Sequence, residues 1–255
     1  MKIIYWLFIV ISGISNIAQA ADFDATVDFS PRLELSLPVS GMVKTVNVTA
    51  GQRVVKGEEL LSLDPVPFKA AMTYAQSRLT IQQTLLSESL RDLKQQQELY
   101  ERTVLATVEL ENAELRVKRD KASVENAQAQ LDEAVYELAY SKIVAPFDAL
   151  ILSVEVNPGQ SINNALQSKT LISLVRQNHY QARFYASAEA LEKIKIGQTA
   201  TVTTEGEGYQ AVISSISYEP LQRSGDDGSR YMIQAGFTSE KKSMPPGVNA
   251  RVHVD

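Results

Sequence analysis

The chain has 255 residues, 44% of them hydrophobic, with 25 Lys and Arg against 30 Asp and Glu. This length allows one large domain or two to three small ones. A net charge of −5 and the lack of a basic block argue against nucleic acid as a partner. No cysteine is present, which excludes disulfides, thiol chemistry and a lipid-bearing cysteine.

The first 20 residues have the pattern of a secretory signal peptide. Lys2 precedes the apolar run IIYWLFIVISGI, and Ala18 to Ala20 form a small-residue cleavage site. The alternative is an N-terminal membrane anchor, but the run is shorter than the ~20 residues of a membrane span. The sequence therefore predicts an exported, soluble protein that starts at Ala21, most simply in a bacterial periplasm.

Residues 23–65 alternate between apolar and polar side chains, as half-buried strands do. The alternating apolar residues are Phe23, Ala25, Val27 and Phe29, and then Leu33, Leu35 and Leu37, with Gly41, Gly51 and Gly57 as turns.

Residues 68–145 contain neither Gly nor Pro and are rich in Gln, Glu, Leu, Ala and Lys, which predicts helix. Two heptad stripes cross this region. The first comprises Phe68, Met72, Ala75, Leu79, Gln82, Leu86, Ser89, Leu93, Gln96 and Tyr100, and the second Leu110, Ala113, Val117, Asp120, Val124, Ala127, Leu131, Ala134 and Leu138. Between them, residues 103–108 (TVLATV) are the least helical.

The stripes predict an antiparallel coiled-coil hairpin of two helices, each about 35 residues and roughly 50 Å long, that folds back at residues 103–108. Gln82, Gln96 and Asp120 weaken the seam. They either fix its register or are simply tolerated there.

From Ile143 onward the pattern is β again. The predicted strands are Gln181–Ala186, Thr199–Thr204, Gln210–Ser217, Tyr231–Phe237 and Val248–Val254. One short helix is predicted from Ser187, its N-cap, to Gly197, which would end it.

A β-pattern occurs twice, at residues 38–63 and 145–174. Pro38 to Gly51 and Pro146 to Gly159 are equal steps, and each Gly is followed by Gln. Each copy is too small to bury its own apolar face, so the two should share one core, with Val43, Val46 and Val48 against Ile151, Val154 and Val156. A β-sandwich split by a helical hairpin satisfies this pattern.

These segments resemble the two halves of a lipoyl-like domain around a coiled-coil insertion, as in the membrane fusion proteins, the RND-type and HlyD-like periplasmic adaptors of tripartite efflux and secretion systems. Residues 182–206 and 244–254 resemble the β-barrel domain of these adaptors. The resemblance implies an elongated, mixed α+β protein. Its expected parts are a barrel (21–37 and 175–255), a lipoyl-like domain (38–65 and 142–174) and a hairpin (66–141).

The resemblance also implies a bridging role without catalysis or cofactor. The expected partners are an inner-membrane transporter, an outer-membrane channel and sister copies, as a hexamer or a trimer of dimers. The hairpin tip would meet the channel, through Leu99, Thr103, Val104, Leu105, Ala106 and Thr107.

Two features depart from the family pattern. Adaptors that dock on channels often carry an Arg, a Leu and a Ser near the tip, and the matching positions here are Gln95, Leu99 and Ala106, so only the Leu agrees. The membrane-proximal domain that usually lies beyond the barrel is expected to be missing.

Other functions find little support. His179 and His253 lack metal-ligand spacing, and partly exposed barrel histidines are expected instead. A lipoyl or biotin carrier needs a lysine in the turn that joins the two halves, where neither Lys56 nor Lys69 lies. A periplasmic coiled-coil scaffold or chaperone remains the alternative, although it would need neither the repeat nor the barrel.

Overall fold

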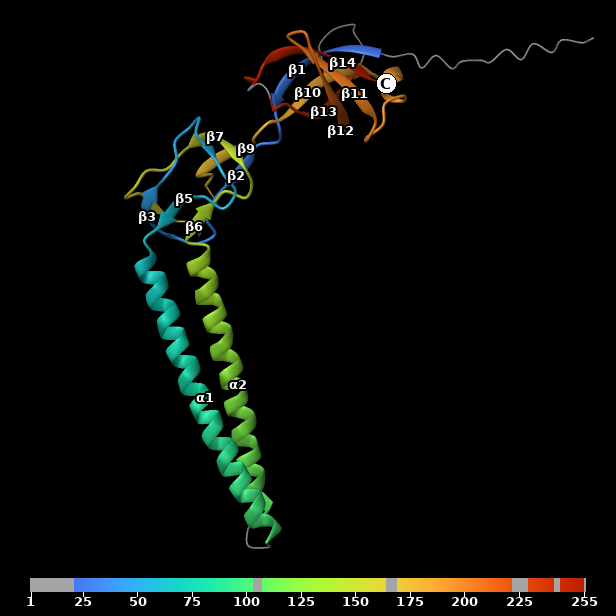
Figure 1. Cartoon of the computed structure of the whole chain (residues 1–255). Helices are drawn as coiled ribbons and strands as arrows, with labels where there is room; N and C mark the ends of the chain where they lie inside the picture. Colours follow the sequence, from blue (N-terminus) through green and yellow to red (C-terminus); the bar gives the residue numbers. More distant parts are fainter. Residues whose placement is uncertain (1–20, 103–106, 164–168, 222–228, 241–243, 255) are drawn as a thin grey trace, which may run out of the picture. The chain divides into compact units, whose positions relative to one another are not determined.

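The computed structural model describes residues 21–102, 107–163, 169–221, 229–240 and 244–254. The chain forms two compact units, one from residues 32–177 and the other from residues up to 31 together with those from 178 onward. The expected mixed α+β fold of helical hairpin, lipoyl-like sheets and β-barrel is confirmed (Figure 1). The predicted signal peptide lies outside the described residues. Within them, no helix has the length and apolar character needed to cross a membrane.

The first unit contains two four-stranded sheets, each built from both halves of the repeat. One sheet has the order β2 (Leu33–Leu35), β9 (Ile172–Arg176), β7 (Ala149–Val154) and β4 (Arg53–Val54), and the other β6 (Lys142–Val144), β5 (Glu59–Leu63), β3 (Gly41–Val46) and β8 (Ser161–Ile162). The short strands β4 and β8 each pair with the other half. The shared core is confirmed, because Val43, Val48, Ile151 and Val156 are buried in one cluster, with Val46 and Val154 packed against it.

The repeated Gly-Gln turns hold the two halves together through matching hydrogen bonds. The Gly51 N–H donates to the Ile151 carbonyl, and the Gly159 N–H donates to the Val43 carbonyl, both at 2.8 Å. Both glycines have positive φ, 84° and 82°, a conformation that glycine adopts without steric cost. The 13-residue spacing therefore reflects an internal pseudo-symmetry, in which each half caps a strand of the other.

The glutamine that follows each glycine closes its own turn. The Gln52 Oε1 accepts from the Thr49 N–H at 3.1 Å, and the Gln160 Oε1 accepts from the Asn157 N–H at 3.2 Å. A carboxamide in this position replaces a backbone partner that a tight turn lacks. The repeated Gly-Gln pair is thus a structural requirement of the turn.

The hairpin consists of α1 (Pro65–Glu101) and α2 (Thr107–Ala139), which run side by side (Figure 1). Asp64 caps α1, since its Oδ1 accepts from the Val66 N–H at 3.2 Å and Pro65 occupies the first helical position. Thr107 and Val108 already belong to α2, so the predicted turn at residues 103–108 does not extend to them.

The predicted seam agrees with the burial of both helices. Every residue of the two stripes is buried or half-buried except Tyr100, which is exposed. Tyr100 lies in the last turn of α1, at the end of the seam. Ala75, Ala113, Ala127 and Ala134 are buried in the seam, as are the larger Phe68 and Leu79.

The second unit is a closed barrel. Its strand order is β1 (Ala21–Phe29), β10 (His179–Ser187), β13 (Arg230–Thr238), β12 (Glu207–Leu221), β11 (Thr199–Thr204) and β14 (Val248–Val254). The predicted strands all occur, most of them longer by a few residues. Residues that alternate along the strands fill the interior, with Val27, Phe184, Val202, Ile233 and Val252 fully buried.

Two sequence-based boundaries are corrected. Strand β2 pairs with β9, and Leu33, Leu35 and Leu37 pack in the sandwich core, so residues 32–37 and 175–177 belong to the sandwich unit rather than to the barrel. The apolar alternation of residues 33–37 could fit either domain, and only its pairing partner decided between them.

The short helix is also shorter than predicted. It spans α3 (Ala188–Leu191), capped by Ser187 as expected, but Gly197 does not end it. Gly197 instead belongs to a third Gly-Gln turn, in which its N–H donates to the Ile213 carbonyl at 2.9 Å. The Gln198 Oε1 accepts from the Lys195 N–H at 2.9 Å, as in the two sandwich turns.

Candidate partner-binding surfaces

The distal end of the hairpin is the first candidate surface. Leu99 lies half-buried in the last turns of α1, and Thr107 is exposed at the first position of α2. The other predicted tip residues, Thr103, Val104, Leu105 and Ala106, lie outside the described residues. Gln95, at the usual Arg position, is exposed on α1.

Two exposed side chains extend this surface along both helices. Tyr100 is exposed on α1 and Val108 on α2, where 63% of Val108 is accessible. An apolar side chain that stays open beside a charged coiled coil gains by association with a partner. The end of α1 and the start of α2 therefore both offer apolar contacts.

An interhelical ion pair lies in the distal third of the hairpin. The Arg116 Nη1 of α2 lies 2.9 Å from the Asp92 Oδ2 of α1. The Asp92 Oδ1 also lies 3.4 Å from the Gln96 Nε2. Both charged side chains are partly exposed, so the pair adds little stability, but it links the two helices in one register near the tip.

A second surface, which we call the lateral stripe, runs along α1 outside the seam. It consists of Tyr74, Ile81 and Leu85, all exposed, at spacings of seven and four residues that place them on one side of the helix. The sequence reasoning missed this stripe because it followed the heptad seam alone. Apolar residues outside the seam that recur at spacings of four and seven are the sequence signal that would have predicted the lateral stripe.

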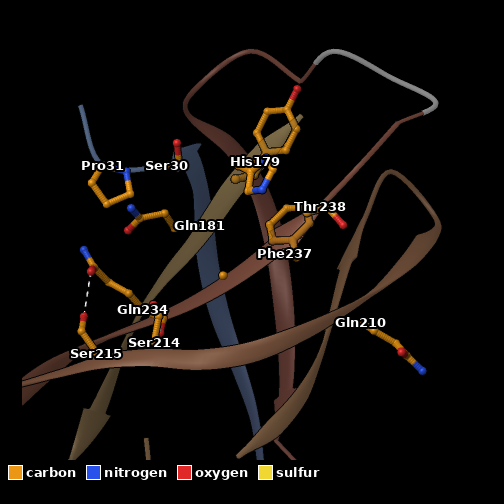
Figure 2. Close-up of a pocket in the computed structure, with 12 residues that line it drawn as sticks. Ser30, Pro31, His179, Gln181, Gln210, Ser214, Ser215, Gln234, Phe237 and Thr238 are labelled. Atoms are coloured by element: carbon orange, nitrogen blue, oxygen red, sulfur yellow. Dashed lines mark hydrogen bonds between the residues drawn. The ribbon is translucent and has the colours of Figure 1, made fainter. Parts of the chain in front are cut away.

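The barrel carries a third candidate, a groove of about 510 Å³. Figure 2 shows Gln181 and Gln234 on the same side as Pro31, and Gly236 also lines this groove. These residues are neighbours across the sheet. Gln181 of β10 is paired with Gly236 of β13, and Gln234 of β13 is paired with Ser215 of β12. We call this feature the barrel groove.

The two histidines and two lysines singled out from the sequence lie on different elements of the described structure. His179 is on β10 and His253 on β14, where its Nδ1 lies 2.7 Å from the Asp22 Oδ1. No group of three or more potential ligands gathers within the described part of the chain. Lys56 lies in the turn between β4 and β5 of one half, and Lys69 is exposed on α1.

Comparison with known proteins agrees with this architecture. The family model described as the barrel-sandwich hybrid domain of RND membrane fusion proteins matches residues 32–174. The efflux pump periplasmic linker BepD of Brucella suis is 25% identical over 200 residues, which cover 78% of this chain and 50% of BepD. The multidrug resistance protein MdtA of Yersinia enterocolitica is 29% identical over 154 residues, 60% of this chain and 34% of MdtA.

The chain thus spans half, or about a third, of the length of these relatives. Among solved structures, the membrane fusion protein Spr0693 of Streptococcus pneumoniae matches with a TM-score of 0.71 at 18% identity, over 92% of this chain and 98% of that one. A MacA–MexA chimera with the Pseudomonas aeruginosa MexA hairpin matches with a TM-score of 0.65 at 21% identity, over 92% and 80%. These likenesses show the fold. The family match covers more than half of the residues, and the chain belongs to the RND membrane fusion protein family.

Proposed function

We propose that the chain is a periplasmic adaptor that links an inner-membrane transporter, most simply of the RND type, to an outer-membrane channel for the export of small molecules. The family match supports this role, as does the relative described as an efflux pump periplasmic linker. The observation that carries the proposal is a long hairpin inserted into a split sandwich, with apolar side chains exposed at its distal end.

The work of such an adaptor is mechanical rather than chemical. A helix of 37 residues, such as α1, is roughly 55 Å long at 1.5 Å per residue. Its root is tied to the sandwich, because Phe68 is buried in the sandwich core and the Ser141 carbonyl accepts from the Leu63 N–H at 2.8 Å. A hairpin held in this way can transmit a contact at its tip to the sandwich.

The distal end is proposed as the surface that meets the channel. The sequence predicts Leu99 and Thr107 as part of this surface, and Tyr100 and Val108 add exposed contact area. Apolar and aromatic side chains that become buried at an interface contribute most of its binding energy. Because Gln95 and Ala106 replace the usual Arg and Ser, we expect the contact to differ in detail from that of channel-docking adaptors.

The lateral stripe is proposed as a contact between sister copies. Tyr74, Ile81 and Leu85 face away from the seam, so they remain available when the hairpin is folded. Each copy presents the same stripe, and a ring of copies would cover the stripes in turn. We expect Ile81→Asp to abolish higher cross-linked species in cells while the purified protein keeps its melting temperature.

The test of the channel contact is site-specific photocrosslinking in cells. A photoreactive amino acid at Thr107 should capture an outer-membrane protein, whereas the same residue at Thr73, an exposed threonine near the hairpin root, should not. If mass spectrometry identifies the protein captured at both positions as a periplasmic client, the result would favour the scaffold or chaperone function. Capture of an outer-membrane protein at Thr73 alone would contradict docking through the tip.

A further inference from the structure

We propose that the barrel groove is a binding site for a small, neutral saccharide. The groove is formed within the barrel unit, over strands β10, β13 and β12 and the end of β1. Its volume of about 510 Å³ lies within the range of pockets that hold small organic ligands. All its lining residues belong to the barrel unit and none to the hairpin, so the proposal does not rest on the proposed contact with the channel.

The absence of a side chain at Gly236 opens this groove. Gly236 has no positive φ that would require glycine, and a Cβ added there would meet Ser214 and Val212 only at 4.0 Å, an ordinary contact. Strand formation therefore does not demand a glycine at this position, and most residues would be favoured over it in a strand. A glycine at such a position marks a place where a ligand can approach the backbone closely.

The polar groups around Gly236 are amides and hydroxyls. The Ser215 Oγ donates to the Gln234 Oε1 at 2.7 Å, which orients the Gln234 amide and leaves its Nε2 to donate elsewhere. Gln181 lies on the same side, and no hydrogen bond of its side chain is found within the described residues. Carboxamides offer a donor and an acceptor side by side, which suits the hydroxyl groups of a sugar.

An unpaired hydroxyl lies at the same place. The Ser30 Oγ is buried and has no hydrogen-bond partner among the residues that the structure describes. A buried polar atom without a partner costs free energy, which a ligand or an ordered water would recover. Ser30 lines the groove, so a ligand bound there could supply the missing partner.

The charge of the lining selects a neutral ligand. The described lining residues include no Asp, Glu, Lys or Arg, and the one imidazole among them is that of His179. At neighbouring register positions, Arg183 and Asp28 bond each other at 2.8 Å and leave little net charge for a ligand. A charged group placed in this groove would lose hydration without gaining a partner charge. Hydrogen bonding without charge thus favours a saccharide over a sugar phosphate or an ionic drug.

Saturation-transfer NMR on the purified full chain tests this site, with N,N′-diacetylchitobiose and maltose as probes and glucose 6-phosphate as the charged comparison. At least one neutral disaccharide should bind saturably, and the sugar phosphate more weakly. Preference for chitobiose would identify an N-acetylated glycan, and preference for maltose a plain hexose.

Two variants and one matched control locate the binding. Gly236→Val places methyl groups in the groove, and Gln181→Leu removes one amide at similar size. Each should weaken binding by about tenfold or more, Gln181→Leu through the loss of one well-formed polar contact and Gly236→Val through steric exclusion of the ligand. Gly208→Val adds the same side chain on β12, where a Cβ would only touch Thr201, and should leave binding unchanged.

Circular dichroism of each variant distinguishes loss of the site from loss of the fold. If Gly236→Val fails to fold, Gln181→Leu decides the matter alone. The proposal is overturned if neither disaccharide binds saturably, or if the folded variants bind as the wild type does.

Discussion

At the scale of single residues, one turn recurs in three places. Gly51, Gly159 and Gly197 all have positive φ, and each N–H donates to a carbonyl of a strand distant in sequence. The glutamine after each glycine closes the turn with its side chain. The same small device thus joins the two halves of the sandwich and anchors β11 in the barrel.

The backbone of these turns should make substitution costly even where space is free. No atom lies within 4 Å of a Cβ added at Gly159, so Gly159→Ala introduces no clash and measures the left-handed conformation alone. We expect a loss of about 1–2 kcal/mol in the free energy of unfolding. Chemical denaturation checks this value.

Gly208→Ala is the control for this substitution, because Gly208 lies in a strand without positive φ. It should leave stability unchanged or raise it slightly. An equal loss in both variants would show that left-handed strain is not the cause.

A second prediction at this scale concerns docking of the tip. Val108 and Leu115 are seven residues apart on the same face of α2 and are similarly exposed, at 63% and 60%. Val108→Asp should reduce export strongly, since it places a charge in the proposed apolar interface. Leu115→Asp, farther from the tip, should reduce it less.

Drug or solute resistance in cells measures this difference, alongside the melting temperature of each purified variant. Both variants should melt close to the wild type because both positions are exposed. Equal export by the two variants would argue against the tip as the docking surface.

At the scale of elements, the hairpin depends on a seam that contains polar side chains. Asp120 occupies a seam position of α2 with only 14% of its side chain exposed, and its ion-pair partner is the adjacent Arg119 of the same helix. Gln82 and Gln96 are half-buried in α1. The ion pair of Asp120 does not involve the opposite helix, which favours tolerance of this aspartate over a role in fixing the register.

Replacement of Asp120 tests this interpretation. Asp120→Leu should stabilise the hairpin by about 1 kcal/mol, because it extends the apolar stripe and removes a partly buried charge. Thermal unfolding and size-exclusion chromatography check the result. A less stable or newly oligomeric variant would instead show that Asp120 specifies the register.

At the scale of the whole molecule, the hairpin and the sandwich share a core. Phe68 of α1 is only 9% exposed within the sandwich cluster, and Leu138 of α2 packs against the same cluster. A deletion of residues 68–141 would therefore remove part of the sandwich core. The seam between the two helices thus does not bury the root of the hairpin by itself.

Two deletions separate the hairpin from its root. Replacing residues 73–134 with a short Gly-rich linker retains Phe68 and Leu138 and should leave a body that unfolds cooperatively. Replacing residues 68–141 should cost a further ~3 kcal/mol or more through the loss of a buried Phe. Calorimetry compares the two deletion variants, and equal stability would show that the root contributes nothing to the core.

The sequence by itself determined the local structure of this protein. The heptad stripes predicted which faces of α1 and α2 are buried, since a helix repeats its faces at a fixed period whatever surrounds it. The alternating strands and the equal Pro-to-Gly-Gln steps likewise predicted two half-sheets with one core. The order of these pieces was enough to indicate the family.

Only the tertiary structure decided which distant segments pair. The alternation of residues 33–37 fits a barrel or a sandwich equally well, and its place followed from hydrogen bonds to β9. The sequence predicted Gly197 as the end of a helix, whereas in the structure its N–H donates to the Ile213 carbonyl in a turn. The barrel groove lies where Gln181 is paired with Gly236 and Gln234 is paired with Ser215, across three strands. Each outcome depends on contacts between residues far apart in the chain, which local periodicity cannot specify.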